Sequence, residues 1–322
     1  MSYSKPATLS KLTDATIGCF SRLPPSEFVD HLVRYLSTWS GSDKFFSIIQ
    51  SLLSLLAAYL NLRAKLQHRF GRRSDPTSSA APRLLKFVKV LSSSRTLYRF
   101  WGLIPIVQWM ISLERNPQPT RNLLNIERFQ GWSMLGFYPL EHLSFLRSQD
   151  VLPPRVSVSV PPLTDKPKSF KIDAGELSLW SCRCWAAYVA LHFAHLREER
   201  KLIQARQRDL RKGKGKSLSA AEKEELRKRW SAYWSDLVMN TANFALALNA
   251  SSRTGLMSGV WNDILTLLAT AIAFKSGWKA TALPSGSKSA PTLTVDPDFN
   301  EKETIAGYDA SLDTAQVTAG TQ

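Results

Sequence analysis

Cysteine is scarce in this sequence, with three residues among 322. So few cysteines, and an odd number of them, do not provide the disulfide framework of a small secreted domain, and we expect a reducing, cytosol-facing environment. The first residues lack the apolar segment of a secretory signal, and the last residues carry neither a Ser-Lys-Leu nor an ER-retention address. We therefore expect any organelle-targeting signal to be internal.

Long hydrophobic runs are also few. The mean hydropathy of -0.17 argues against a polytopic transporter, which needs many apolar spans, but it leaves room for one or two membrane segments. Hydrophobic residues at 44% and charged residues at 21% exclude a chain that is disordered throughout. The length of 322 residues suits about two ordinary domains.

Acidic residues are the scarcer charge. Forty-two Lys and Arg against 26 Asp and Glu give a net charge of +16, which predicts an anionic partner, either nucleic acid or an acidic membrane surface. No zinc-finger spacing, RNP motif or basic region running into heptads is present. The basic residues alternate with apolar segments of membrane length, and aromatic residues are frequent. This pattern favours an anionic phospholipid membrane, and we expect no nucleic-acid partner.

Residues arranged for catalysis or metal binding are missing too. No Ser/His/Asp, Cys/His or paired-carboxylate arrangement stands out. The stretch Lys212–Ser217 has Leu210 where a phosphate-binding loop requires glycine. Four residues of metal-ligand type meet no standard zinc spacing: Cys182, Cys184, His192 and His195. We therefore expect no enzyme, no catalytic residues, no cofactor and no metal.

What the sequence does contain is helical periodicity, which predicts an all-α, membrane-associated protein. Five prolines between Val151 and Asp173 predict a linker (151–173) between an N-terminal helical region (1–150) and a C-terminal membrane region (174–282). Residues 283–322 are rich in Ser, Thr, Gly and Pro and predominantly acidic, which predicts a disordered acidic tail.

In the N-terminal region, Pro24-Pro25-Ser26-Glu27 predicts the start of a short helix, and Ser42-Asp43 the start of a stronger one. The stretch 45–62 is uncharged but contains serines, Gln50 and Asn61, so we favour a buried or interfacial helix over a membrane span. Two further apolar stretches, 101–113 and 126–146, contain a proline each, and we expect both to be broken there.

Residues 84–101 form the most informative segment, because apolar residues recur at spacings of three and four while the polar residues are basic, with no acid. This pattern is typical of an interfacial helix on anionic lipid. The predicted membrane-binding apolar face is Leu84, Phe87, Val90, Leu91, Leu97, Tyr98 and Trp101, and the predicted basic face is Lys86, Lys89, Arg95 and Arg99. The same pattern also fits a helix docked on the core of the protein, and the segment alone does not decide between the two.

The C-terminal region has two hydrophobic segments, 177–196 and 255–274, each twenty residues long with one charge. Both have the length of a membrane crossing, and the alternative is a pair of buried helices in a soluble bundle. A basic loop at 197–229 separates them, and its later part, Ser219 to Trp230, predicts a charged helix. A simple hairpin does not place both this loop and the basic N-terminal region on the cytosolic side, so the topology stays open.

Several short motifs occur in order along the chain. They are Asp43-Lys44 with Gln50 and a leucine-rich run to Leu60, then Arg95 with Arg99-Phe100-Trp101-Gly102, Glu141-His142 before the linker, Trp180–Trp185, Trp234–Leu237 and Trp278-Lys279. Taken together over about residues 25 to 280, they resemble the peroxisomal biogenesis factor 11 family, in a divergent branch of fungal gamma or C-like type.

The resemblance implies a peroxisomal membrane protein that elongates or tubulates the membrane through the helix at 84–101 and so promotes peroxisome fission and proliferation. It further implies homo-oligomers and three partners besides the membrane: a fission adaptor, a dynamin-like GTPase and the peroxisomal membrane-protein import receptor. Three alternatives remain: a membrane pore or metabolite channel, with Arg183, Asn262 and Asp263 as candidate lining residues; an adaptor scaffold that does not itself bend lipid; and a soluble basic scaffold.

Overall fold

The computed structural model describes residues 17–18, 24, 26–116, 118–158, 168–212 and 219–283. The expected acidic tail lies outside this part from residue 284 onward. The helices are α2 (Glu27–Ser37), α3 (Trp39–Arg69), α4 (Ala81–Tyr98), a 3-10 turn η2 (Arg99–Gly102), α5 (Leu103–Arg115), α6 (Arg121–Ser148), α7 (Ala174–Lys212), α8 (Ala220–Ser251) and α9 (Gly259–Ala280). The predicted helical class is confirmed for the described residues.

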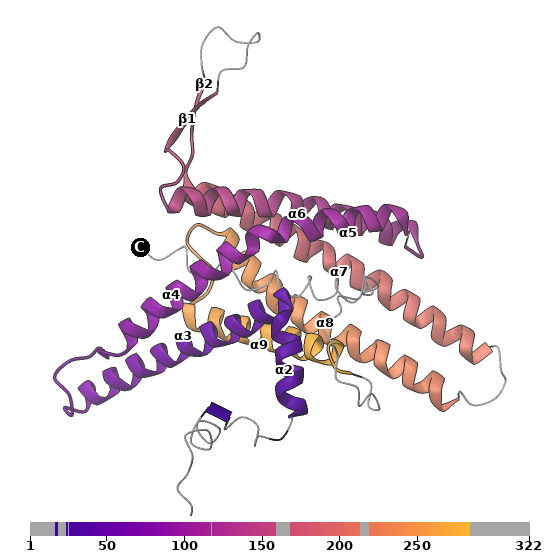
Figure 1. The fold of residues 1–322 in the computed structure, drawn as a ribbon, viewed down its shortest axis with the longest axis horizontal. Coiled ribbons are helices and arrows are strands. Elements are labelled where there is room, and N and C mark those ends of the chain that lie inside the picture. The colour runs from indigo at the N-terminus through magenta and orange to yellow at the C-terminus, as the bar shows by residue number, and fades with distance from the viewer. Residues whose placement is uncertain are drawn as a thin grey trace, which may run out of the picture.

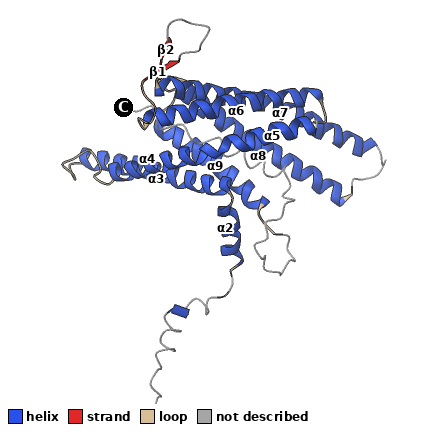
Figure 2. Ribbon diagram, turned by 45° about the horizontal axis from the view of Figure 1, so that its top comes forward, coloured by secondary structure: helices blue, strands red, loops and turns tan. Residues whose placement is uncertain are grey.

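Neighbouring helices pack in a continuous series. Helix α5 packs on α6, α6 on α7, α7 on α8, α8 on α9, α9 on α3 and α3 on α4 (Figure 1). Two helical hairpins project from opposite ends of this assembly: α3 with α4, and the distal parts of α7 and α8 (Figures 1 and 2). Much of the expected basic loop at 197–229 is therefore helical, since it forms the end of α7 and the start of α8.

Local sequence accounts for where the helices begin. Ser26 accepts a hydrogen bond from Val29 N at the start of α2, as the Pro-Pro-Ser-Glu motif predicts. Helix α3 begins at Trp39, earlier than expected, because Thr38 is the residue whose hydroxyl accepts from Gly41 N, at 3.0 Å. At α8, Ser219 and Glu222 form a reciprocal capping box.

The two prolines expected to break helices do not do so. Pro105 lies in the first turn of α5, where its missing N–H would have had no partner within the helix in any case. Helix α6 runs through Pro139 without interruption. Pro139 lacks the backbone N–H that would donate to the carbonyl four residues earlier. Because the nearby residues Tyr138 and Glu141 are held in the interior by neighbouring helices, tertiary packing outweighs the loss of this hydrogen bond.

The linker contains two strands that the sequence analysis did not predict. Strand β1 (Arg155–Val158) pairs antiparallel with β2 (Lys168–Lys171), and Arg155 is opposite Lys171. Strand β1, Arg-Val-Ser-Val, alternates in polarity with a period of two, a signal that the surrounding prolines obscured, whereas the sequence of β2 does not alternate.

The main apolar core lies where α6, α7 and α8 meet. Its largest members, all almost fully buried, are Met134, Phe137, Tyr138, Trp185, Tyr188, Val189 and Leu246. The central stretch of α7, one of the two segments expected to cross a membrane, therefore supplies core residues of the kind found in a soluble bundle. Cys182 is buried and Cys184 partly buried in the same helix.

Helices α3 and α9 pack through small and polar residues instead. Ser47 Oγ lies 3.2 Å from Thr270 Oγ1, and the Ser54 hydroxyl donates to the Asp263 carboxylate. Large apolar residues of the same helices, such as Leu52 and Trp261, point outward. Small and hydroxyl-bearing residues between helices with large apolar residues outside are typical of helix packing in membranes.

Among the described helices, α3 alone is long and apolar enough to cross a membrane by length and composition. This differs from the expectation, which placed the crossings at 177–196 and 255–274, within α7 and at α9. The expected segments are diluted by polar residues, whereas α3 contains an uninterrupted uncharged stretch.

The first and last described helices contact each other. The ring centroids of His31 on α2 and Trp278 on α9 are 3.8 Å apart, and His31 Nε2 lies 2.9 Å from the Trp278 carbonyl oxygen. The edge of Tyr35 packs on Phe274, with centroids 4.7 Å apart. These contacts join residues separated by most of the chain.

The close approach of Gly102 to α6 gives a test of this fold. A Cβ atom at this position would lie 2.5 Å from the buried Tyr138 ring, so Gly102→Ala must displace that ring. We expect a loss of about 1–3 kcal/mol in unfolding free energy, measured by urea unfolding in detergent solution. Gly259→Ala is the control, because a Cβ there meets nothing within 4 Å. Equal effects of the two substitutions would contradict the predicted packing.

Candidate membrane interface

Helix α4 is attached to α3 through Arg95. The Arg95 guanidinium donates from Nε to Asp43 Oδ1 at 2.8 Å, from Nη2 to Asp43 Oδ2 at 3.2 Å and from Nη1 to Gln50 Oε1 at 3.0 Å. Arg95 is 2% exposed and Asp43 is 5% exposed. A buried charge is tolerated when its partner and hydrogen bonds replace water, and this two-pronged pair meets that condition.

The turn after α4 is attached to α6 through Arg99. Its Nε donates to Glu141 Oε2 at 3.1 Å, and its Nη2 donates to Glu141 Oε1 at 2.6 Å and to Thr96 Oγ1 at 3.1 Å. Beside it, the Phe100 ring stacks on His142, with centroids 4.2 Å apart. The two ion pairs together fix both the position and the rotation of α4.

These contacts correct the predicted basic face. Arg95 and Arg99 point into the protein and are buried, so they do not reach a membrane. Lys86 and Lys89 are exposed and remain available. The helical wheel gave the angular positions of the four basic residues, but it did not reveal that acidic partners on α3 and α6 hold two of them inside.

The predicted apolar face, in contrast, is mostly on the outside. Phe87, Val90, Leu97, Tyr98 and Trp101 are exposed, with Trp101 at 69%, whereas Leu84 and Leu91 are half-buried. Val88, which was not among the predicted residues, faces inward and is buried. Helix α4 and the turn after it thus hold Arg95 and Arg99 inside and aromatic and aliphatic side chains outside, the reverse of a helix on the surface of a soluble protein.

Exposed apolar residues continue onto the neighbouring helices. We define the outer apolar face as the exposed large side chains of α3, α4, η2 and α5: Leu52, Leu56, Tyr59, Leu62, Leu66, Leu85, Phe87, Val90, Leu97, Tyr98, Trp101, Ile104, Val107 and Ile111. Single exposed apolar residues are normal in soluble proteins, but a set of this size on adjacent elements indicates a surface that binds a membrane or another protein. The sequence predicted a buried or interfacial helix at 45–62 of α3, but it did not predict the contribution of α5.

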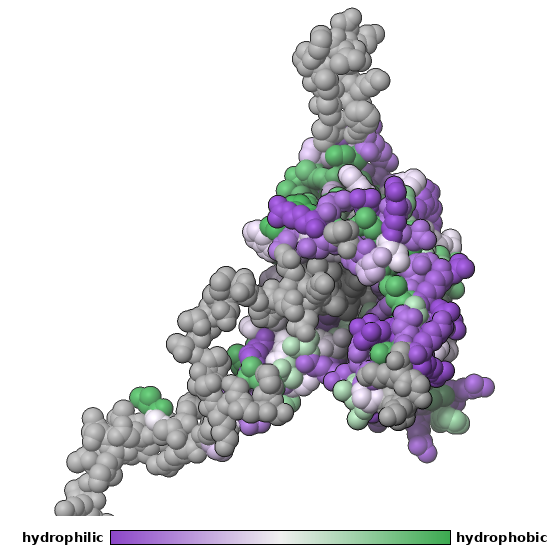
Figure 3. Space-filling model, turned by 90° about the vertical axis from the view of Figure 1, so that its right-hand side faces the viewer, coloured by the Kyte–Doolittle hydropathy of each residue, from purple (hydrophilic) through white to green (hydrophobic). Residues whose placement is uncertain are grey.

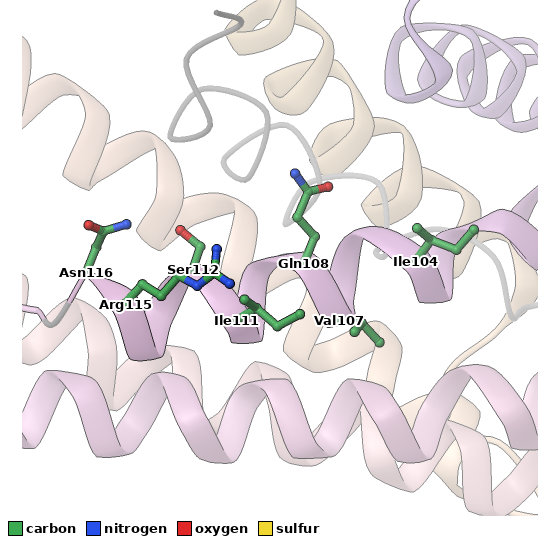
Figure 4. A pocket seen from close by; sticks show the side chains of 7 residues that line it. All are labelled: Ile104, Val107, Gln108, Ile111, Ser112, Arg115 and Asn116. Carbon is green, nitrogen blue, oxygen red and sulfur yellow. The ribbon is translucent and has the colours of Figure 1, made fainter. Parts of the chain in front are cut away.

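A shallow hollow runs along α5 at one end of this region. Its described lining comes from α5 and the residue that follows it: Ile104, Val107, Gln108, Ile111, Ser112, Arg115 and Asn116 (Figure 4). The polar side chains among these lining residues do not converge on a common point, so they do not form a catalytic site. No group of three or more His, Cys, Asp or Glu residues able to hold a metal occurs within the described ranges.

A cluster of titratable groups is buried between α6 and α7, away from the outer apolar face. Gln118 Nε2 donates to Glu127 Oε2 at 2.8 Å, and His195 Nδ1 lies 3.5 Å from Glu127 Oε1. The rings of His192 and His195 stack, with centroids 5.2 Å apart. Burial raises the pKa of Glu127 to about 7 and lowers the pKa of His195 to about 4; burial and the neighbouring His195 lower the pKa of His192 to about 3.

Comparison with protein families matches residues 29–261 to one family, described as Peroxisomal biogenesis factor 11 (PEX11). The chain belongs to the peroxisomal biogenesis factor 11 family. No curated protein and no solved structure matches the chain. Membership assigns the protein to peroxisome biogenesis and proliferation and to proteins associated with the peroxisomal membrane, in a family not known for enzymes.

The matched region contains the residues that form the two buried ion pairs. Asp43, Gln50, Arg95, Arg99 and Glu141 all belong to the motifs on which the resemblance to the peroxisomal biogenesis factor 11 family was based. Asp43, Arg95, Arg99 and Glu141 are charged residues within otherwise apolar helical segments. This feature of the sequence is the one from which their ion pairs could have been inferred. The structure gives these motif residues a physical role, which is to attach α4 with its apolar residues outward.

The Arg95–Asp43 pair can be tested by removing one partner. Asp43→Ala leaves a buried guanidinium without its counter-charge, and we expect a loss of about 3–5 kcal/mol in unfolding free energy. Asp43→Leu combined with Arg95→Met should recover much of this loss, because it removes both charges. Glu114→Ala, which breaks the exposed pair with Arg128, serves as the control and should have little effect. A loss no larger than the control would show that the pair does not hold α4.

The buried Glu127 predicts a pH-dependent stability. Its folded-state pKa of about 7 lies above the ordinary 4.5, so the folded protein retains a proton that the unfolded chain releases as the pH rises between these values. The stability contribution of Glu127 therefore falls through this window and is lowest above pH 7. Glu127→Gln should exceed wild type in unfolding free energy by about 1–3 kcal/mol above pH 7 and converge with it near the ordinary pKa of the carboxyl.

Urea unfolding at several pH values measures this difference. His192 and His195 are uncharged in both the folded and the unfolded protein well above pH 7, so the difference measured there reports Glu127 alone. A difference between variant and wild type that is independent of pH would contradict the assignment.

Proposed function

We propose that the protein bends the peroxisomal membrane by lying in its cytosol-facing leaflet with the outer apolar face in contact with lipid, and that this promotes elongation and fission of the organelle. The observation that carries the proposal is the outward orientation of the apolar residues of α4, fixed by Arg95 and Arg99. Family membership supplies the peroxisomal setting.

An orientation in the plane of the membrane suits this hairpin better than a crossing. Ser78 N donates to Asn61 Oδ1 near the tip, and Arg95 contacts Gln50 near the base, so the intervening part of α4 runs beside the uncharged stretch 45–62 of α3. That part of α4 exposes three basic residues: Arg83, Lys86 and Lys89. A crossing would bring them into hydrocarbon at about 2.5–3.5 kcal/mol each near the bilayer centre, whereas an in-plane hairpin leaves them among headgroup phosphates.

The energetics of insertion are favourable. Burying the five exposed apolar residues of the predicted face of α4 and η2 contributes on the order of 5–10 kcal/mol. Each basic side chain near an anionic leaflet adds roughly 1 kcal/mol. Because the helix is already formed and attached, little conformational entropy is lost on binding. Bulky side chains inserted in one leaflet expand that leaflet relative to the other, and this asymmetry favours curvature.

The residues proposed to line a channel do not support that alternative. Asn262 is bonded to Asn249, Asp263 accepts from Ser54, and the Arg183 guanidinium lies over the Trp180 ring at 4.6 Å. Each of the three is held locally and they face no common lumen. Homo-oligomers and contacts with a fission adaptor, a dynamin-like GTPase and the import receptor remain proposals drawn from the family resemblance.

Vesicle remodelling by the full-length protein tests the proposal. Phe87→Glu combined with Leu97→Glu places two charges on exposed positions, so the fold should be retained. We expect wild type to bind and tubulate vesicles made of equal parts of phosphatidylcholine and phosphatidylserine, and the double variant to lose tubulation. The matched control exchanges the two residues, Phe87→Leu with Leu97→Phe, and should tubulate like wild type. Tubulation by the Glu variant would overturn the proposal.

A further inference from the structure

The tip of the α3–α4 hairpin concentrates positive charge. Between residues 63 and 89 there are eight Lys or Arg residues and one acid, Asp75, a net charge of +7. All eight are exposed except Arg73, which is half-buried: Arg63, Lys65, Arg69, Arg72, Arg73, Arg83, Lys86 and Lys89. Only Lys86 and Lys89 belong to the basic face predicted for α4, so most of this charge has no function assigned to it so far.

The charge at the tip is not balanced by acids of the protein. None of the eight basic residues forms an ion pair with an acid in the described part of the chain. The other projecting hairpin also has an excess of basic residues, 13 against 6 acids between 197 and 229, but part of its charge is paired, since Arg227 pairs with Glu224 at 2.8 Å and Arg229 with Glu225 at 2.9 Å. Unbalanced basic charge of this density attracts an anionic partner.

Apolar side chains lie among the basic ones at the tip. Leu62, Leu66 and Phe70 are exposed, and Phe70, at 74%, is among the most exposed large apolar residues of the protein. The distal parts of α7 and α8 expose no large apolar side chain among their described residues between 197 and 229. Figure 3, which views the molecule from the side of that hairpin, shows a predominantly hydrophilic surface there. The two hairpins therefore suit different surroundings.

The apolar residues at the tip are held by a regular helix end. Phe70 N donates to the Leu66 carbonyl at 3.0 Å, and Arg72 N donates to the Gln67 carbonyl at 2.9 Å. Gly71 between them has a φ of 69°, the left-handed conformation that ends a helix in this way. Phe70 and Arg72 thus have defined positions, and the tip is a built surface.

We propose that this tip, composed of Arg63, Lys65, Leu66, Arg69, Phe70, Arg72 and Arg73, is a second membrane anchor that selects anionic phospholipid. Phe70 and Leu66 enter the leaflet while the basic side chains bind headgroup phosphates. The proposal rests on the proposed function, because it assigns the partner of the same hairpin. An anionic bilayer fits better than an acidic protein, because the exposed apolar residues of the tip continue those of the outer apolar face along α3.

The two anchors have different roles in this arrangement. The apolar residues of α4 supply insertion on any bilayer, whereas the tip supplies most of the preference for negative charge, to which Lys86 and Lys89 also contribute. Helix α4 is 18 residues long, about 27 Å, so its apolar residues extend away from the tip along the same hairpin. Binding at both positions fixes the hairpin parallel to the membrane.

Flotation of the full-length protein with vesicles tests the tip separately from α4. Arg69→Gln, Arg72→Gln and Arg73→Gln together should weaken binding by about 100-fold on equal parts of phosphatidylcholine and phosphatidylserine. Binding to pure phosphatidylcholine should not change, and the dependence of binding on salt should become weaker. The matched control, Arg208→Gln with Arg211→Gln and Lys212→Gln, removes the same charge from exposed positions of α7 and should bind like wild type.

The outcomes separate the two proposals. Equal weakening by the tip and α7 variants would show a general effect of net charge and overturn the second anchor, as would full binding by the tip variant. In either case, loss of tubulation by the Phe87→Glu/Leu97→Glu variant would leave the proposed function standing. Selective loss of anionic binding in the tip variant, with residual tubulation at saturating protein, would support both anchors.

Discussion

Two buried guanidinium groups determine which side of α4 faces outward. The cost of leaving either arginine without its carboxylate in the interior is several kcal/mol, so only one rotation of the helix is compatible with the fold. Asp43 and Glu141 lie on different helices, and the two pairs therefore also set the angle between α3, α4 and α6. The exposure of the aromatic and aliphatic residues follows from this constraint, because burial of the arginines turns the opposite side of α4 away from the protein.

The protein combines two kinds of interior. Around α6, α7 and α8, large apolar residues such as Trp185 and Leu246 form a core like that of a water-soluble bundle. Between α3 and α9, hydroxyl and small side chains meet, and the large residues are outside. A chain with both arrangements is suited to the boundary between water and lipid, with the first part supporting the second.

The sequence predicted the helical class, the amphipathic helix at 84–101 and the starts of α2 and α8, because these depend on local periodicity and capping. It did not predict the direction in which α4 faces, since Asp43 and Glu141 are more than 40 residues away along the chain. The uninterrupted α6 shows the same limit, because packing around Pro139 decided the outcome. The expected C-terminal crossings rested on length and low charge, which a buried core helix such as α7 shares with a membrane span.

The pairing of α3 with α9 has a consequence for synthesis of the protein. Ser47 and Thr270 are 223 positions apart, and His31 and Trp278 are 247 apart, so α3, with its long uncharged stretch, is translated well before its partner α9. Throughout elongation α3 has no native neighbour on that side, and unshielded apolar segments aggregate. We therefore expect the nascent chain to need a holding chaperone or an early membrane encounter until α9 has emerged.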